Sequence, residues 1–222
     1  MAEDTNIQDH SEVSYKVLQT VEEFVEEIGD RGCTSHFEAV LNDGKLFKGN
    51  KLEQKPEAFT ERYLIFKLLH RLDHPIRTRP VQYAPKWKHG RGIPDFCLTT
   101  VPVDTAKQKD LRLFGESKTP NKIEYARTQV KEYLEKDLDF HAVTVLSDGF
   151  EWELWVRPLG ESPKLAYYTD LQPVFREVKS LNLENESYSP HKVRGMIHED
   201  VFKQFTAAAV LDTVRTEFGI QV

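Results

Sequence analysis

The chain has 222 residues, 39% of them hydrophobic and 30% charged, and a formal net charge of −6. A chain of this length and apolar content can bury the core of one mixed α/β domain with appendages. Two cysteines, Cys33 and Cys97, are too few for a disulfide framework, and neither a membrane-spanning apolar run nor a secretion signal is present. Zinc-ligand spacings and the Gly-rich loop of ATP motors are missing too. We therefore expect a reduced, cytoplasmic protein with no membrane partner.

Hydrophobic spacing predicts the elements in chain order. A helix with a strongly acidic polar face is expected over 15–28, within an N-terminal helical extension, 1–56, of the core domain. Pro56 then begins a helix that carries Glu61. The polar segment 103–110 is expected to be a loop between two strands. The remaining core elements are strands near 78–83, 93–99 and 111–118, a helix at 123–136, and strands near 141–146 and 151–157.

This order of elements fits a mixed central β-sheet flanked by helices, with its core at 57–160. Beyond the core, residues 161–222 are expected to form a C-terminal helical appendage. Its helices are placed at 171–178 and 198–218, and a polar linker covers 182–194. The last helix has a small apolar face that suits packing on the core, contact with another subunit, or a connection to a further domain.

Two short motifs end neighbouring strands. The first, Gly-Ile-Pro-Asp, ends at Asp95, and the second, Gly-Glu-Ser-Lys, ends at Lys118. Side chains two residues apart share a face of a strand, so Glu116 and Lys118 are expected on one side and Ser117 on the other. If the two strands pair, two carboxylates and one ammonium group converge at an edge of the sheet.

Such a group of side chains suits metal-dependent hydrolysis of a phosphodiester. Hard cations such as Mg²⁺ take carboxylate oxygens together with water and substrate phosphate. Asp95, Glu116 and the main-chain carbonyl of Ser117 would be the ligands, and Lys118 would hold the nucleophile and stabilise the transition state. Mn²⁺ is expected to substitute for Mg²⁺. The alternative is that Pro-Asp is an ordinary turn and that Glu-x-Lys lies on a solvated strand.

The Pro-Asp and Glu-x-Lys motifs resemble those of the PD-(D/E)xK nuclease superfamily over about residues 57–158. The resemblance implies a restriction-endonuclease-like fold. That superfamily often carries a glutamate on the helix before the first strand, which Glu61 matches, and this implies that Glu61 is a metal ligand and a catalytic residue. By spacing alone, Glu61 shares the inward face of its helix with Ile65 and Leu68. A charge at the start of the helix, favoured by the helix dipole, is the alternative interpretation.

A second element of the resemblance lies in the helix 123–136. Gln129 and Tyr133 are similar to the Gln-x3-Tyr element of the branch related to restriction and recombination nucleases. This implies a catalytic role for Gln129 and a nucleic-acid contact for Tyr133, whereas a polar helix face is the alternative. The hairpin at 143–155 resembles the one that follows this helix in the nuclease domain of Type I restriction enzyme R subunits. DNA is then the expected substrate, and a helicase-like motor, a specificity subunit or an oligomer remains open as a partner.

The charge is divided unevenly along the chain. Residues 77–127 hold eleven basic and five acidic residues, whereas residues 1–30 hold one lysine and nine acids. A basic excess around the two motifs would attract a nucleic-acid backbone. Lys86, Lys88 and Arg91 immediately precede Asp95 and are expected to bind phosphates beside the scissile bond.

The sequence thus predicts a Mg²⁺-dependent DNA endonuclease of restriction or defence type. Asp95, Glu116 and Lys118 are its expected catalytic residues, with Glu61 and Gln129 as additional ones. Two alternatives remain open. One is a non-catalytic nucleic-acid-binding or docking module with the same fold, and the other is a nuclease of repair or RNA processing.

Overall fold

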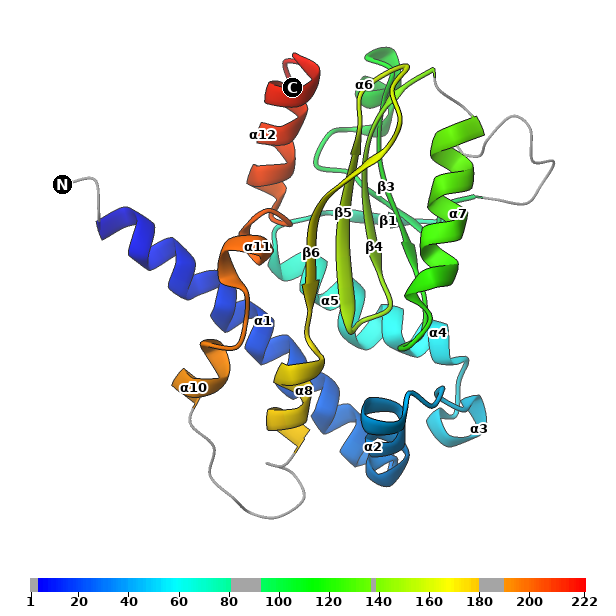
Figure 1. The fold of residues 1–222 in the computed structure, drawn as a ribbon, viewed down its shortest axis with the longest axis vertical. Helices are drawn as coiled ribbons and strands as arrows, with labels where there is room; N and C mark the ends of the chain where they lie inside the picture. The colour runs from blue at the N-terminus through cyan, green and yellow to red at the C-terminus, as the bar shows by residue number, and fades with distance from the viewer. Residues whose placement is uncertain (1–3, 81–92, 137–138, 180–189) are drawn as a thin grey trace.

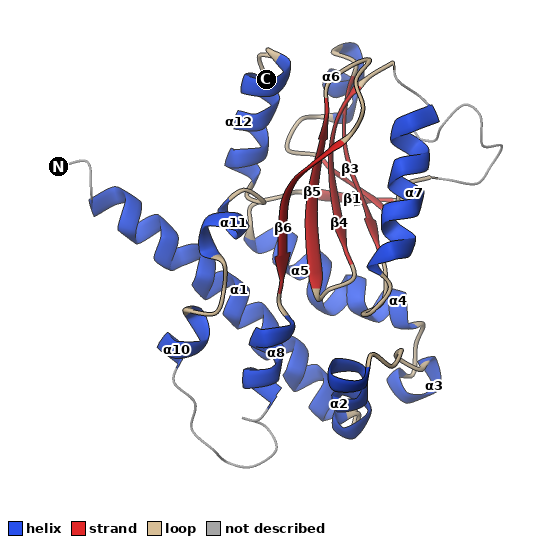
Figure 2. Ribbon diagram, viewed as in Figure 1, coloured by secondary structure: helices blue, strands red, loops and turns tan. Residues whose placement is uncertain are grey.

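The computed structural model describes residues 4–80, 93–136, 139–179 and 190–222 (Figure 1). One mixed sheet of six strands, in the order β1-β2-β3-β4-β5-β6, forms the centre of the protein (Figure 2). β3 and β4 are parallel, and the other neighbouring strands are antiparallel. The strands are β1 (Ile76–Thr78), β2 (Phe96–Leu98), β3 (Leu111–Ser117), β4 (His141–Ser147), β5 (Glu151–Arg157) and β6 (Lys164–Asp170).

Helices cover both faces of the sheet. α7 lies along one face, where Val103 of α6 also joins its core, and α1, α5, α11 and α12 lie toward the other (Figure 1). The helices are α1 (Asp4–Asp30), α2 (Thr34–Asp43), α3 (Gly49–Leu52), α4 (Pro56–Thr60), the π-helix η1 (Glu61–Ile65), α5 (Phe66–Arg71), α6 (Val103–Gln108), α7 (Ile123–Lys136), α8 (Gln172–Lys179), α10 (Pro190–Arg194), α11 (Glu199–Lys203) and α12 (Ala207–Phe218).

The central strands are buried on both faces, so each contributes to two hydrophobic cores. On β3, Leu111 and Leu113 join the larger core with α1 and α5. Phe114 joins the smaller core, in which it meets Tyr133 and Val130 of α7. Alternate side chains of a strand point to opposite faces, and this periodicity explains the division. It also fixes the side of β3 on which each residue of the Glu-Ser-Lys motif emerges.

The predicted mixed α/β sheet flanked by helices is confirmed, but several segments differ from expectation. Residues 161–222 are not only helical, because β6 lies within them and pairs with β5 as an edge strand. Residues 103–110 are not simply a loop, because they contain the short helix α6. The helix expected at 198–218 is divided into α11 and α12 at Thr206, whose hydroxyl accepts a hydrogen bond from the Ala209 N–H and caps α12.

Physical reasons for these differences are visible in the packing. β6 shows no apolar alternation because its residues are exposed from Lys164 to Tyr168. In α6, Val103 and Ala106 are one turn apart and both are buried, so tertiary contacts stabilise a helix of low propensity. The strand expected at 78–83 differs because β1 ends at Thr78, and the linker expected at 182–194 differs because 190–194 form the helix α10. Residues 81–83 and 182–189 of these two predictions lie outside the described residues. No helix in the described part of the chain has the length and apolar character needed to cross a membrane.

Candidate metal centre

The two motifs meet where β2 and β3 pair. The antiparallel register sets Phe96 opposite Gly115 and Cys97 opposite Phe114. One further step along the same register brings Asp95 opposite Glu116. Both side chains are buried, with 4% and 1% of their surface exposed. The structure therefore brings the two carboxylates together at the sheet edge.

Gly115 makes this close approach of the strands feasible. A β-carbon at this position would collide with the ring of Phe96 on β2 and with the carbonyl oxygen of Val145 on β4. Only glycine leaves this space free. The residue immediately before Glu116 therefore sets how closely the carboxylate-bearing ends of β2 and β3 lie.

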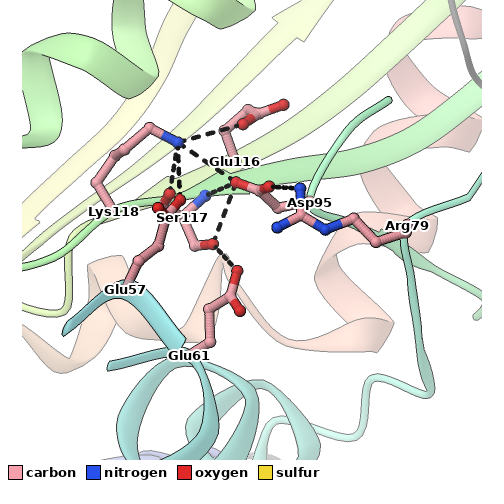
Figure 3. Close-up of polar contacts among 7 residues, drawn as sticks. All are labelled: Glu57, Glu61, Arg79, Asp95, Glu116, Ser117 and Lys118. Carbon is pink, nitrogen blue, oxygen red and sulfur yellow. Dashed lines mark hydrogen bonds and ion pairs between the residues drawn. The ribbon is translucent and has the colours of Figure 1, made fainter. Parts of the chain in front are cut away.

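Ser117 projects to the side of β3 opposite Glu116, as the strand period predicts. Its hydroxyl donates to Glu61 Oε1 at 2.5 Å and lies 3.3 Å from Asp95 Oδ2, while its N–H donates to the same oxygen at 3.0 Å (Figure 3). The main-chain carbonyl of Ser117, which stays a predicted metal ligand, accepts a hydrogen bond from Lys118 Nζ at 2.7 Å. Ser117 therefore links Asp95 to Glu61 through its hydroxyl and N–H.

A continuous helical segment, α4 followed by η1, brings two more carboxylates to the strand ends. Glu57 and Glu61 are one turn apart and point toward Ser117 and Asp95 (Figure 3). One carboxylate oxygen from each of Glu57, Glu61 and Asp95 lies within 4.8 Å of the others. Glu57 was not predicted from the sequence. Its spacing of four residues from Glu61 is the signal that indicates a shared helix face.

Lys118 lies among the carboxylates. Its Nζ is 3.2 Å from Glu57 Oε1, 3.4 Å from Asp95 Oδ2 and 3.6 Å from Glu116 Oε2 (Figure 3). Burial alone would lower the pKa of this amine, but the surrounding acids raise it above its ordinary value. Lys118 is therefore a fixed positive charge.

The acids titrate differently from one another. Burial and the neighbouring charge of Asp95 raise the pKa of Glu116 well above its ordinary value, and burial also raises that of Glu61. For Asp95, burial is outweighed by the hydrogen bond with Glu116 and the charge of Lys118, so its pKa falls. Asp95 and Glu116 thus act as a coupled pair in which Glu116 holds the proton.

These residues fit a hard divalent cation. Glu116 Oε1 is buried and, among the described residues, has no hydrogen-bond partner. An oxygen in that position normally needs a donor or a cation. Glu57, Glu61 and Asp95 bring three carboxylate oxygens within 4.8 Å of one another, and carboxylate oxygen is the ligand type that Mg²⁺ and Mn²⁺ prefer.

Gln129 and Tyr133 occupy different positions on α7. Gln129 is partly exposed and lines a pocket that also includes Lys118 and Glu57. Tyr133 is only 4% exposed, and its ring packs edge-on against Phe114. Burial and the charge of Glu116 raise its pKa. Tyr133 therefore lies in the core beside Glu116 and offers no surface for the nucleic-acid contact that the resemblance implied.

The other predicted phosphate-binding residues lie outside the described residues, namely Lys86, Lys88 and Arg91. Arg79 was not predicted as a site residue, but its guanidinium donates to Asp95 Oδ1, and its N–H donates to the Asp95 carbonyl oxygen at 2.9 Å. Its backbone has φ of 49°, in the left-handed region. Arg79 therefore fixes the orientation of Asp95 from the end of β1.

Comparisons of the chain with protein-family models, curated proteins and solved structures found no significant match. By its fold and site the chain is a mixed α/β protein with a partly buried carboxylate cluster around one lysine.

Proposed function

We propose that this protein is a Mg²⁺-dependent nuclease of the PD-(D/E)xK kind that hydrolyses phosphodiester bonds of DNA. One observation carries the proposal: the ammonium group of Lys118 lies within 3.6 Å of carboxylates from two strand ends and a helix. A cluster in which three acids, two of them buried, surround one largely buried lysine is costly to maintain for stability alone. It suits a site at which the carboxylates bind a cation and the lysine contacts a phosphate beside that cation.

In this proposal Asp95, Glu61, Glu116 and Glu57 hold the cation. A bound divalent cation supplies two effects, a lowered pKa for water and neutralisation of charge on the phosphate oxygens. Lys118 remains protonated because its pKa is raised, so it acts on the developing negative charge of the phosphate rather than as a base. Ser117 and Arg79 are positioning residues, since both donate hydrogen bonds to Asp95.

The choice of DNA and of a restriction or defence role rests on the resemblance and on charge. The basic excess in residues 77–127 surrounds the two motifs, as a nucleic-acid backbone requires. A helicase-like motor or specificity subunit as partner is part of the same proposal. Cytoplasmic localisation is a further part of the proposal, supported by two cysteines that are both free and buried.

Cleavage of supercoiled plasmid in Mg²⁺ or Mn²⁺, compared with EDTA, tests the proposal. We expect metal-dependent nicking by the wild-type chain and a loss of about 100-fold or more in Lys118→Ala, because one preorganised cation at the transition state contributes about that much. Lys136→Ala is the matched control, since that lysine is exposed and pairs with Glu132 elsewhere on α7. Equal nicking by Lys118→Ala would contradict the assignment.

The same assay separates the two alternatives. A non-catalytic module predicts salt-sensitive DNA binding with no metal-dependent turnover. A repair or RNA-processing nuclease predicts turnover that is confined to branched DNA, damaged DNA or structured RNA. Parallel reactions with plasmid, single-stranded, branched and RNA substrates distinguish these outcomes.

A further inference from the structure

A pocket of about 480 Å³ opens beside the carboxylate cluster, between the end of β3 and the first turns of α7. Lys118 and Glu57 form the wall that it shares with the cluster. Tyr125, Lys122 and Gln129 form the wall on the α7 side. Its volume lies within the range of about 300–1,000 Å³ that is typical of small-ligand sites.

Tyr125 is the side chain in this pocket that best indicates a ligand. It is 60% exposed although it is a large aromatic residue, and Lys122 Nζ lies 4.5 Å from the centre of its ring. Among the described residues, Lys122 forms no ion pair, so its charge is available to an anion. An exposed ring beside a cation that forms no ion pair is a combination with which proteins bind nucleobases and their phosphates.

We propose that this pocket receives one unpaired base of the substrate strand, stacked on Tyr125. The amide of Gln129 offers a donor and an acceptor to the base edge, and Lys122 faces an adjoining phosphate. The inference rests on the proposed function, because Lys118 and Glu57 place the next phosphate at the carboxylate cluster. It makes single-stranded or locally unpaired nucleic acid the preferred substrate.

The preference for an unpaired base follows from the geometry of stacking. Inside a duplex, each base is covered on both faces by its neighbours and is paired along its edge. A side chain can replace a neighbouring base only when the base has left the stack, which costs free energy in a duplex and little in a single strand. Ends, gaps and flaps provide such bases without this cost.

The test is the binding of the full chain to an oligonucleotide of about 15 nucleotides that carries one 2-aminopurine, as a single strand and as a blunt hairpin duplex. EDTA prevents metal-dependent cleavage, and stacking quenches the fluorescence of 2-aminopurine. We expect tighter binding and quenching for the single strand. Tyr125→Ala should weaken that binding by about 10-fold and abolish the quenching, whereas Tyr125→Phe should retain both.

Tyr15→Ala is the matched control, because Tyr15 is 57% exposed and lies on α1, away from α7 (Figure 1). Equal affinity for the two substrates, or unchanged binding by Tyr125→Ala, would overturn the inference. A parallel cleavage reaction with Mg²⁺ separates the two proposals. Tyr125-dependent binding without any cleavage would refute the nuclease and keep the pocket. Cleavage at the same rate by Tyr125→Ala and the wild-type chain would refute base binding in the pocket and leave the proposed nuclease activity standing.

Discussion

At the level of single residues, the carboxylates differ in how tightly each holds a proton. Glu116 and Glu61 have raised pKa values because they are buried, whereas Asp95 has a lowered one because Glu116 and Lys118 favour its charged form. Because their pKa values are raised, a cation competes with protons for Glu116 and Glu61. Metal binding should therefore release protons and strengthen as the pH rises.

The same shifts predict a pH dependence of stability in EDTA. A raised pKa in the folded state favours folding at low pH, and this contribution is lost as the pH rises above the ordinary glutamate value of 4.5. Glu116→Gln, which cannot ionise, should therefore gain thermal stability over the wild-type chain as the pH rises above the ordinary glutamate pKa of 4.5.

Thermal unfolding with and without Mg²⁺ measures both effects. Mg²⁺ should stabilise the wild-type chain more at high pH than at low pH, and it should stabilise Glu116→Gln much less. Glu135→Gln, an exposed position on α7, is the control and should behave as the wild type. A stabilisation by Mg²⁺ that does not change with pH would contradict the raised pKa values of Glu116 and Glu61.

At the level of elements, the spacing of strands around Gly115 decides the geometry of the site. Gly115→Ala should destabilise the fold by about 1–3 kcal/mol, because the new methyl group collides with the Phe96 ring and the Val145 carbonyl oxygen. It should also reduce metal affinity, since β2 and β3 would move apart.

Chemical denaturation measures the stability change. Gly29→Ala in α1 is the matched control, because a methyl group there meets nothing within 4 Å and alanine favours a helix. A Gly115→Ala protein as stable as Gly29→Ala would show that the close approach of the strands is unimportant.

A buried ion pair joins α7 to β5. Arg127 Nε donates to Glu153 Oε1 at 2.6 Å, and Glu153 is only 1% exposed. Arg127→Ala should cost about 3–5 kcal/mol, because it leaves a buried carboxylate without its cation. Lys136→Ala breaks an exposed pair on the same helix and should cost less than about 1 kcal/mol. Denaturation measures the loss of stability in each variant. Similar losses in the two variants would show that the buried carboxylate of Glu153 does not need the charge of Arg127.

At the level of the whole molecule, His74 connects the C-terminal helices to the rest of the fold. Its Nε2 is 2.7 Å from the carbonyl oxygen of Phe205, and its Nδ1 is 3.1 Å from Thr100 Oγ1. Burial lowers the pKa of His74 from 6.5 to about 4. The folded protein therefore favours the neutral ring, and this contribution to stability is present above the ordinary pKa and lost as the pH falls toward 4.

Replacement of His74 should reveal this contribution. The loss of stability between about pH 6.5 and about pH 4 should be smaller in His74→Phe than in the wild-type chain, although His74→Phe starts less stable because the Phe205 carbonyl loses its donor. His191→Gln, at an exposed position, is the control. Parallel pH profiles for His74→Phe and the wild type would contradict a buried neutral histidine.

The parts of the fold that were predictable are those with local signals. Strand periodicity, which is readable from spacing, places Glu116 and Lys118 on one side of β3. Their approach to Asp95 was predicted only on the condition that the two strands pair, and the structure supplies that pairing and its register. Glu57 and Arg79 depend on how α4 and β1 reach the strand ends, which is set by tertiary packing. β6 escaped prediction because its exposed residues lack the apolar alternation by which a strand is recognised.

The central claim is that the acids at the ends of β2 and β3 form a metal-dependent centre for cleavage of nucleic acid. Asp95→Asn tests it most directly, because the amide preserves the shape of the side chain while removing the charge that binds a cation. Cleavage of labelled single-stranded and duplex DNA is measured with Mg²⁺, with Mn²⁺ and with EDTA. We expect cleavage by the wild-type chain in either metal, none in EDTA, and none above background by a folded Asp95→Asn protein. Full activity of Asp95→Asn, or cleavage that persists in EDTA, would contradict it.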